Sequence, residues 1–282
     1  MISFTNKTDL AKKQKDLLDK IKKLKQEAIY KHNISVKQIK LYREQNIKFQ
    51  IKEKYNSIIP LNFYTCWHTK DLPPLMKENY EQMVLQNPEL KFQLYDEDEC
   101  RQFIEQNFEL EVLEAYNSLI PCSYKSDLWR FCVLYINGGI YMDIKYKCVN
   151  NFKLVALTEK EYFVRDRPIN MTYTALIVVK PQNSIMLQCI NKIVNNVKTK
   201  YYGKNALEPT GPGLLGTCFS KKEFEDMELY FSDTTTENFK QDYMVFKNSI
   251  ILTYYDEYRN EQKKYQKNKY YSQLWDERKI YK

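Results

Sequence analysis

Glycine is scarce in this sequence, with six residues among 282. They stand in few places, namely the pair Gly138-Gly139, the single Gly203 and the group Gly211, Gly213 and Gly216. Glycine is the residue that best tolerates a tight turn or a close approach between the backbone and another group. The two clusters, 138–139 and 211–216, therefore predict two places where the chain turns sharply or lies against a ligand.

Long apolar runs and paired cysteines are also absent. No window approaches the ~18 apolar residues of a membrane span, and the start, MISFTNKTDLAKKQ, has no apolar stretch of signal-peptide length. The seven cysteines show no Cys-x-x-Cys spacing and stand mostly among apolar neighbours, which is typical of reduced core thiols. We therefore expect a cytoplasmic protein with no membrane span. Histidine is rarer than glycine, and the two residues, His32 and His68, do not form a metal-binding cluster.

The formal net charge is +8, and the excess of positive charge lies toward the two ends of the chain. Residues 1–54 hold 15 Lys and Arg against 6 Asp and Glu, whereas residues 55–254 hold 21 against 25. Nucleic-acid-binding domains have an excess of basic residues, and residues 55–254 have no such excess. We expect no nucleic-acid partner, and a nucleic-acid-binding protein acting through the basic arm stays as an alternative.

Residues 8–30 contain no glycine or proline and repeat apolar residues at helical spacing, as shown by Leu10, Leu17, Ile21, Leu24 and Ala28. This pattern predicts a helix with a narrow apolar seam. The seam fits either a coiled coil that forms a homodimer or a helix that packs on its own domain. We expect a basic helical N-terminal extension over 1–54 and one domain over 55–282.

Strand and helix patterns alternate from Ile58 onward, which indicates an α/β fold. Strands are predicted at 58–67, 91–95, 140–142 and 174–179, with two short ones within 243–253. Helices are predicted at 75–86, after the acidic run 96–99, at 123–137 and at 185–197.

Two carboxylates and one arginine stand at the centre of this pattern. Asp127 and Arg130 are three residues apart on the predicted helix 123–137 and are therefore neighbours on one face. That spacing alone also fits a surface ion pair. Asp143 follows a Gly-Gly turn and a short strand, so it would emerge at the carboxyl end of that strand, where open α/β sheets bind ligands.

The stretch from Ser126 to Asp143 resembles the DXD glycosyltransferases related to initiating mannosyltransferases, capsular polysaccharide glycosyltransferases and, more distantly, clostridial toxin glucosyltransferases. The family pattern is Ser-Asp-x-x-Arg-x-x-x-Leu-x-x-x-Gly-Gly-x-Tyr-x-Asp-x-Asp. Every fixed position matches except the last, where Lys145 replaces Asp. The resemblance, which extends over 58–275, implies a GT-A-like fold, that is, a Rossmann-like nucleotide-diphospho-sugar transferase.

The resemblance also implies roles for individual residues. Asp127, Arg130 and Asp143 would form the catalytic group, with the first two holding the donor sugar and Asp143 touching ribose and metal. A second set would bind the donor: Trp67 at the nucleotide base, Tyr141, Gly138, Gly139, Lys145, and Ser272 and Trp275 of the tail. Thr210-Gly211-Pro212 is similar to a further segment of the family.

The implied activity is transfer of a hexose from a UDP- or GDP-linked donor to a glycan or glycoconjugate acceptor, with retention. Lys145 puts the family's Mn²⁺ or Mg²⁺ in doubt, because an ammonium cannot coordinate a metal. Three interpretations remain open: Lys145 replaces the ion, Asp143 holds the ion with a carboxylate from elsewhere, or the protein is a non-catalytic relative that binds a nucleotide sugar or glycan.

Overall fold

The computed structural model describes residues 17–26, 47–167, 170–236, 239–266 and 269–282, and the chain divides into two compact units at Asn46 and Ile47. In the first unit, residues 17–26 are helical, and the apolar side chains of Leu17, Ile21 and Leu24 are exposed. The rest of the helix predicted over 8–30 lies outside the described residues. Dimerisation through this segment stays a prediction.

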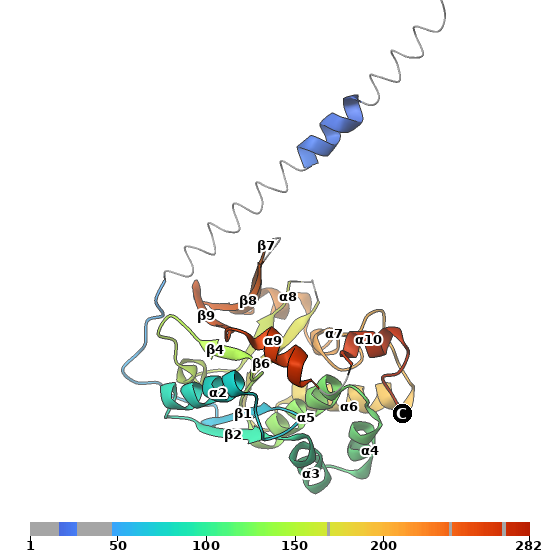
Figure 1. Ribbon diagram of the computed structural model, residues 1–282. Helices are drawn as coiled ribbons and strands as arrows, with labels where there is room; N and C mark the ends of the chain where they lie inside the picture. Colours follow the sequence, from blue (N-terminus) through green and yellow to red (C-terminus); the bar gives the residue numbers. More distant parts are fainter. Residues whose placement is uncertain (1–16, 27–46, 168–169, 237–238, 267–268) are drawn as a thin grey trace, which may run out of the picture. The chain divides into compact units, whose positions relative to one another are not determined.

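The second unit contains one mixed sheet of nine strands in the order β2-β1-β3-β6-β5-β7-β8-β9-β4 (Figure 1). The strands are β1 (Asn62–Cys66), β2 (Lys91–Tyr95), β3 (Gly139–Met142), β4 (Tyr146–Cys148), β5 (Tyr162–Arg165), β6 (Thr172–Val179), β7 (Leu229–Thr236), β8 (Phe239–Phe246) and β9 (Ser249–Tyr254). Strands β2, β1 and β3 are parallel, β5 pairs with β7 in parallel, and the remaining neighbours are antiparallel. The α/β fold expected from the sequence is confirmed.

The helices are α2 (Pro74–Gln86), α3 (Glu97–Asn107), α4 (Leu110–Ser118), α5 (Cys122–Asn137), α6 (Ser184–Lys198), α7 (Pro212–Gly216), α8 (Lys221–Glu225), α9 (Tyr258–Tyr265) and α10 (Tyr271–Asp276), with a 3-10 turn η1 (Leu154–Leu157). Successive strand residues point to opposite faces of a sheet. Tyr64 and Tyr141 accordingly pack in one core with α3 to α6, whereas Phe63 and Ile140 pack in a second core with α2 and β7 to β9.

The turn between α5 and β3 depends on its two glycines. Gly138 has φ +59°, and an added Cβ would lie 2.5 Å from the backbone nitrogen of Pro181. Gly139 has φ +116°, and its Cβ would lie 2.5 Å from the carbonyl oxygen of Asn62 on β1. Both features favour glycine. The pair therefore lets β3 lie against β1 directly after α5, which fixes where Asp143 emerges.

Helix α2 begins without a side-chain cap of its own, because Pro73 occupies the N-cap position. The cap comes from α9: the carboxylate of Glu261 accepts hydrogen bonds from the backbone nitrogens of Leu75 and Met76, both at 2.9 Å. The hydroxyl of Tyr255 also donates to this carboxylate, at 2.9 Å. Free N–H groups of a first helical turn are thereby satisfied by a segment far along the chain.

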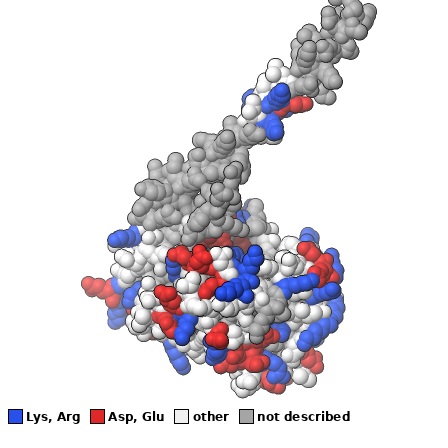
Figure 2. Space-filling model, in the orientation of Figure 1, with Lys and Arg blue, Asp and Glu red and all other residues white. Residues whose placement is uncertain are grey.

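Residues before the predicted domain start at 55 also pack within this unit. The backbone nitrogen of Phe49 donates to the carbonyl of Asn150 at 2.9 Å, and its ring lies 4.9 Å from that of Phe152. Charges of both signs are spread over the face in view in Figure 2. Within the described parts of the chain, none of the helices has the length and apolar character needed to cross a membrane.

Candidate active site

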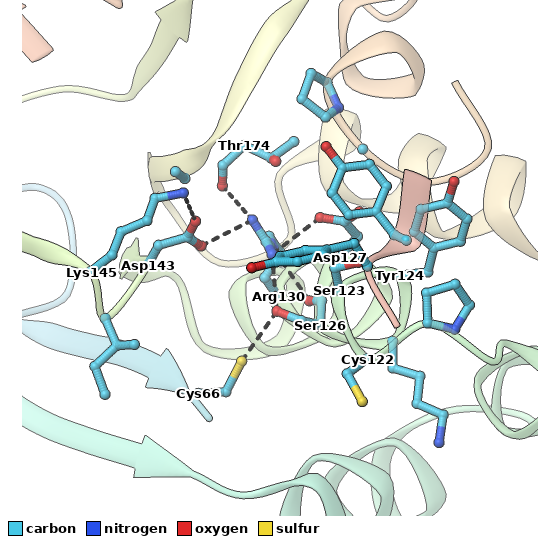
Figure 3. A pocket seen from close by; sticks show the side chains of 18 of the residues that line it. Cys66, Cys122, Ser123, Tyr124, Ser126, Asp127, Arg130, Asp143, Lys145 and Thr174 are labelled. Carbon is cyan, nitrogen blue, oxygen red and sulfur yellow. Dashed lines mark hydrogen bonds and ion pairs between the residues drawn. The ribbon is translucent and has the colours of Figure 1, made fainter. Parts of the chain in front are cut away.

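A cavity of about 580 Å³ opens where the parallel strands β1 and β3 end. It is lined by Cys66 and Trp67 at the end of β1, by Asp143 and Lys145 after β3, and by the first half of α5. This is the carboxyl edge of the parallel strands, where α/β sheets bind ligands. Figure 3 shows Lys145, Asp143, Arg130 and Asp127 joined by a continuous series of ion pairs across this cavity.

Arg130 holds the centre of the site and connects α5 to β3 and β6. Its Nη2 lies 3.1 Å from Oδ1 of Asp127, and its Nη1 lies 3.4 Å from Oδ1 of Asp143. Nη1 also donates to the carbonyl of Thr174 at 2.8 Å, and the guanidinium lies 4.4 Å from the centre of the Tyr141 ring. Because the side chain of Arg130 is only 6% exposed, these contacts fix the guanidinium in one position.

Asp127 is held from both sides. The hydroxyl of Thr210 donates to its Oδ2 at 2.8 Å, opposite Arg130. An added Cβ on Gly211 would lie 3.2 Å from the same oxygen, so the backbone reaches the carboxylate closely at this position. Burial raises the pKa of Asp127, and the charge of Arg130 and the hydrogen bond from Thr210 oppose this increase. Of the second glycine cluster in the sequence, Gly211 thus lies directly against Asp127.

Asp143 uses both carboxylate oxygens within the protein. The hydroxyl of Tyr141 donates to Oδ1 at 2.7 Å, and Nζ of Lys145 lies 2.8 Å from Oδ2. Burial alone would raise the pKa of this carboxyl. The charges of Lys145 and Arg130, together with hydrogen bonds from Lys145 and Tyr141, outweigh burial and lower the pKa to about 2. Asp143 is therefore ionised at neutral pH.

Lys145 is enclosed by aromatic rings as well as by Asp143. Its Nζ lies 5.4, 5.5 and 5.3 Å from the ring centres of Tyr146, Tyr173 and Tyr254, and the side chain is 15% exposed. Burial would lower the pKa of this ammonium, but the charge of Asp143 raises it. Lys145 consequently remains cationic at the edge of the cavity.

The DXD family is typically metal-dependent, but this donor set does not fit a divalent cation. Mg²⁺ and Mn²⁺ need several oxygen ligands, whereas both oxygens of Asp143 face cations or a hydroxyl donor. In the described ranges, no group of three or more His, Cys, Asp and Glu residues could hold a metal ion. Lys145, an ammonium, stands at the position of the second carboxylate in the DXD pattern.

The other predicted site residues divide into two groups. Trp67 and Tyr141 line the cavity, and the indole nitrogen of Trp67 is buried with no hydrogen-bond partner in the described structure. Gly138, Gly139, Ser272 and Trp275 are described and do not line it. The donor-binding roles predicted for these four residues therefore lack structural support. The two glycines instead meet Pro181 and Asn62, as described above.

The predicted tail contact is displaced by a few residues. The indole nitrogen of Trp275 donates to the carbonyl of Tyr202 at 2.6 Å, so this ring serves the packing of α10. Tyr270 and Tyr271, at the start of the same helix, line the cavity in its place. Which side chains of this segment line the cavity depends on the packing of α10, which the sequence pattern does not show.

Several residues of the site had no predicted role. The hydroxyl of Ser126 accepts from Nη2 of Arg130 at 2.9 Å, and the thiol of Cys66 lies 3.2 Å from that hydroxyl. Ser126 stands in the family motif and could have been found there. Cys66 follows Phe63, Tyr64 and Thr65, three apolar or β-forming residues, and nothing in the sequence separates it from a core cysteine. The carbonyl of Thr174 is a backbone contact, for which side-chain patterns give no signal.

Comparison with known proteins agrees with this geometry. Residues 73–164 match the family model described as glycosyltransferase sugar-binding region containing DXD motif. Asp127, Arg130 and Asp143 all lie within the matched residues.

One curated relative is the uncharacterized glycosyltransferase L373 of Acanthamoeba polyphaga mimivirus, 33% identical over 96 residues. This match covers 33% of the chain and 38% of the viral protein, so the chain matches well under half of that relative's length. Among solved structures, the PaToxG glycosyltransferase is similar with a TM-score of 0.44 and 19% identity, over 56% of this chain and 67% of that one.

Proposed function

We propose that the protein is a glycosyltransferase with a GT-A-like site that takes a hexose from a UDP- or GDP-linked donor and transfers it to a glycan or glycoconjugate acceptor, with retention. The observation that carries this proposal is the fixed group of Asp127, Arg130 and Asp143 on the wall of a cavity at the sheet's carboxyl edge. The match of residues 73–164 to a sugar-binding region supports it.

The transfer reaction is favoured by carboxylates and by fixed cations, and the candidate site contains both. When the bond between the anomeric carbon and the phosphate oxygen breaks, positive charge develops on the sugar and negative charge on the departing diphosphate. Carboxylates stabilise the positive charge on the sugar, and fixed cations stabilise the negative charge on the diphosphate. Asp127 and Arg130 would bind hydroxyls of the hexose. Asp143, ionised beside them, would face the nucleotide ribose.

Retention needs no nucleophile from the protein if the acceptor attacks from the side that the leaving group vacates. In that route the acceptor hydroxyl forms the new bond to the anomeric carbon as the old bond breaks. Its proton passes to the departing phosphate oxygen. The residues of this chain then act by positioning and by electrostatics alone.

Lys145 is proposed to provide the positive charge that a metal ion supplies in relatives. Its ammonium is held beside Asp143 and lines the cavity, where it can pair with the diphosphate as a point charge. Donor binding would then be independent of divalent cations. A non-catalytic protein that binds a nucleotide sugar is the second candidate, and the same lysine favours it, because the family's metal ligand is lost.

The cavity extends beyond the charged group toward a region suited to an acceptor. Tyr173 and Phe231 line it with their rings 4.5 Å apart, and Asp166 and Arg167 lie on the same wall. Burial raises the pKa of Asp166, and the neighbouring Arg167 opposes this shift. Aromatic faces next to carboxylate and guanidinium groups suit the apolar faces and hydroxyls of a sugar. We assign the acceptor glycan to this part.

Calorimetric titration with UDP-glucose and with GDP-mannose, each in Mn²⁺ and in EDTA, tests the proposal, followed by an assay of donor hydrolysis and transfer. Binding in EDTA with turnover supports a metal-independent transferase. Binding without any turnover supports the non-catalytic candidate. Binding that needs Mn²⁺ contradicts the role given to Lys145. Absence of binding for a wide panel of nucleotide sugars overturns the proposal as a whole.

A further inference from the structure

A pair of thiols with a neighbouring ammonium lies outside the cavity. These side chains come from α6 and from the residues that follow α7, two helices that are labelled in Figure 1. The sulfur of Cys189, on α6, lies 3.7 Å from the sulfur of Cys218, which follows α7 by two residues. Nζ of Lys192 lies 3.4 Å from the sulfur of Cys218 and 2.6 Å from the hydroxyl of Thr217. Neither cysteine lines the candidate active site.

The two thiols have unequal surroundings. Cys189 is fully buried in the core that α6 shares with α5, whereas Cys218 is partly exposed. The hydrogen bond from Cys189 and the charge of Lys192 outweigh burial and lower the pKa of Cys218 to about 6. Burial raises the pKa of Cys189. At neutral pH the accessible sulfur is therefore a thiolate, and the buried sulfur keeps its proton and donates it in a hydrogen bond.

We propose that Cys218 is a peroxide-reactive thiolate and that Cys189 is its resolving thiol, so that the pair forms a reversible disulfide between α6 and the end of α7. The Cys218 thiolate attacks one oxygen of hydrogen peroxide, which forms a sulfenic acid, and the other oxygen leaves as hydroxide and becomes water on protonation. The Cys189 sulfur then attacks the Cys218 sulfur, and the hydroxyl leaves as water with the proton of Cys189. Two electrons pass from the two thiols to the peroxide.

The geometry allows the second step. A disulfide requires the sulfurs to approach from 3.7 Å to about 2.05 Å. Cys218 follows the last residue of α7, Gly216, in a turn where its backbone nitrogen donates to the carbonyl of Leu215 at 3.0 Å. The cross-link would tie α6 to a segment that begins at Thr210, the hydrogen-bond partner of Asp127.

Another partly exposed thiol provides an internal control. The sulfur of Cys122 lies 3.9 Å from a carboxylate oxygen of Glu97, so a negative charge lies beside it. A negative neighbour disfavours the thiolate, whereas Lys192 favours it. In the same molecule, Cys218 should therefore react faster than Cys122 at neutral pH.

Two measurements on the full chain test the proposal. Limited alkylation with iodoacetamide across pH 5 to 9, followed by peptide mapping, should show Cys218 modified about tenfold faster than Cys122 near pH 7. Treatment with hydrogen peroxide, alkylation of the remaining thiols and non-reducing digestion should give a linked pair of peptides containing Cys189 and Cys218. Dithiothreitol should release it. Equal alkylation rates at the two sites, or peroxide treatment that leaves Cys218 and Cys189 alkylatable, overturns the proposal.

Variants separate the roles of the three residues, with circular dichroism as the check that each is folded. Cys189→Ser should stop the reaction at the sulfenic acid of Cys218, which dimedone traps. Lys192→Met should slow alkylation of Cys218, and Lys192→Arg, which keeps the charge, should restore it. Reaction of Cys218 in Lys192→Met at the rate of the unchanged protein contradicts the assigned role of the ammonium. None of these measurements uses a nucleotide sugar, so their outcome is independent of whether the proposed transfer reaction is correct.

Discussion

The ammonium nitrogen of Lys145, which stands where the DXD pattern has its second Asp, lies 2.8 Å from Oδ2 of Asp143. Lys145→Asp replaces this ion pair with two adjacent carboxylates, which repel each other unless a cation lies between them. We expect donor affinity in EDTA to fall at least about tenfold and to recover when Mn²⁺ is added. Calorimetry with and without Mn²⁺ measures both effects.

Lys145→Met is the matched control, because it removes the charge and keeps most of the stem. It should lose donor affinity in the same way, but Mn²⁺ should not restore it. Thermal unfolding gives a second measure, since Mn²⁺ should raise the Tm of Lys145→Asp and leave that of Lys145→Met unchanged. Equal responses of the two variants to Mn²⁺ would contradict the idea that the lysine replaces an ion.

Loss of the Arg130 guanidinium should abolish transfer. Arg130→Lys keeps the charge but cannot contact Asp127, Asp143 and the carbonyl of Thr174 at once. We expect kcat/KM to fall about 100-fold or more in Arg130→Lys and in Asp127→Asn, with cooperative unfolding retained in both. Near-normal turnover in either variant would show that the site has been assigned wrongly. The exposed ion pair of Arg101 and Glu105 offers a control, because Arg101→Lys should change neither property.

The acid stability of the protein should depend on Asp143. Its pKa is about 2 in the folded state, below the value of about 4 for a free aspartate. The resulting stabilisation is present above pH ~4 and is lost as pH falls from ~4 toward ~2. Between pH ~4 and ~2, the unfolding free energy measured in urea should fall less in Asp143→Asn than in the unchanged protein. This comparison does not depend on how far the two proteins differ in stability at neutral pH. Parallel curves would contradict the assigned pKa.

Gly138→Ala should destabilise the fold without acting on the donor. The new methyl would meet the Pro181 backbone at 2.5 Å while the backbone holds φ +59°, so we expect a loss of about 2–4 kcal/mol of unfolding free energy. The change should leave donor affinity of the folded protein unaltered. A selective loss of donor affinity would restore the donor-binding role that the sequence predicted. Leu85→Ala, at a side chain that is 72% exposed, should change stability by less than about 0.5 kcal/mol.

Two tryptophans should give opposite results. Trp67 lines the cavity, and loss of a base-stacking ring costs about 1–3 kcal/mol, so Trp67→Ala should weaken donor binding about tenfold or more. Trp275→Phe loses the hydrogen bond to Tyr202 and should cost about 1 kcal/mol of stability with donor affinity unchanged. Weaker donor binding in Trp275→Phe would instead support the donor-binding role that the sequence predicted for Trp275.

Local structure could be predicted well where one pattern dominated. The strand at 91–95 and the helix at 123–137 agree with β2 (Lys91–Tyr95) and, within a residue, with α5 (Cys122–Asn137). Helical spacing, the proline at 121 and the two glycines after Asn137 determine α5 without help from the rest of the fold.

The arrangement of the sheet could not be predicted in the same way. Strands β4 and β5 are three and four residues long, too short for a clear alternation. The pairing of β5 with β7 joins segments more than sixty residues apart and depends on tertiary packing. No local preference encodes such a neighbour.

The centre of the site was predictable because Asp127, Arg130 and Asp143 stand in one motif within 17 residues. The structure brings all three into contact, as α5 and β3 pack antiparallel around the glycine turn. Thr210 completes the site from 83 residues away. The aromatic enclosure of Lys145 by Tyr173 and Tyr254 comes from β6 and β9, and only tertiary structure reveals it.

The cap that Glu261 places on α2 has a consequence for biosynthesis. Its partner Leu75 is made 186 residues earlier, so the first turn of α2 leaves the ribosome long before the carboxylate that satisfies it. During translation residues 73–164, which match the family model, emerge with this helix end open and with β3 still lacking its neighbour β6. A nascent chain arrested before residue 261 should therefore expose α2 to proteases. A fragment of residues 73–164 should likewise be degraded when it is made on its own.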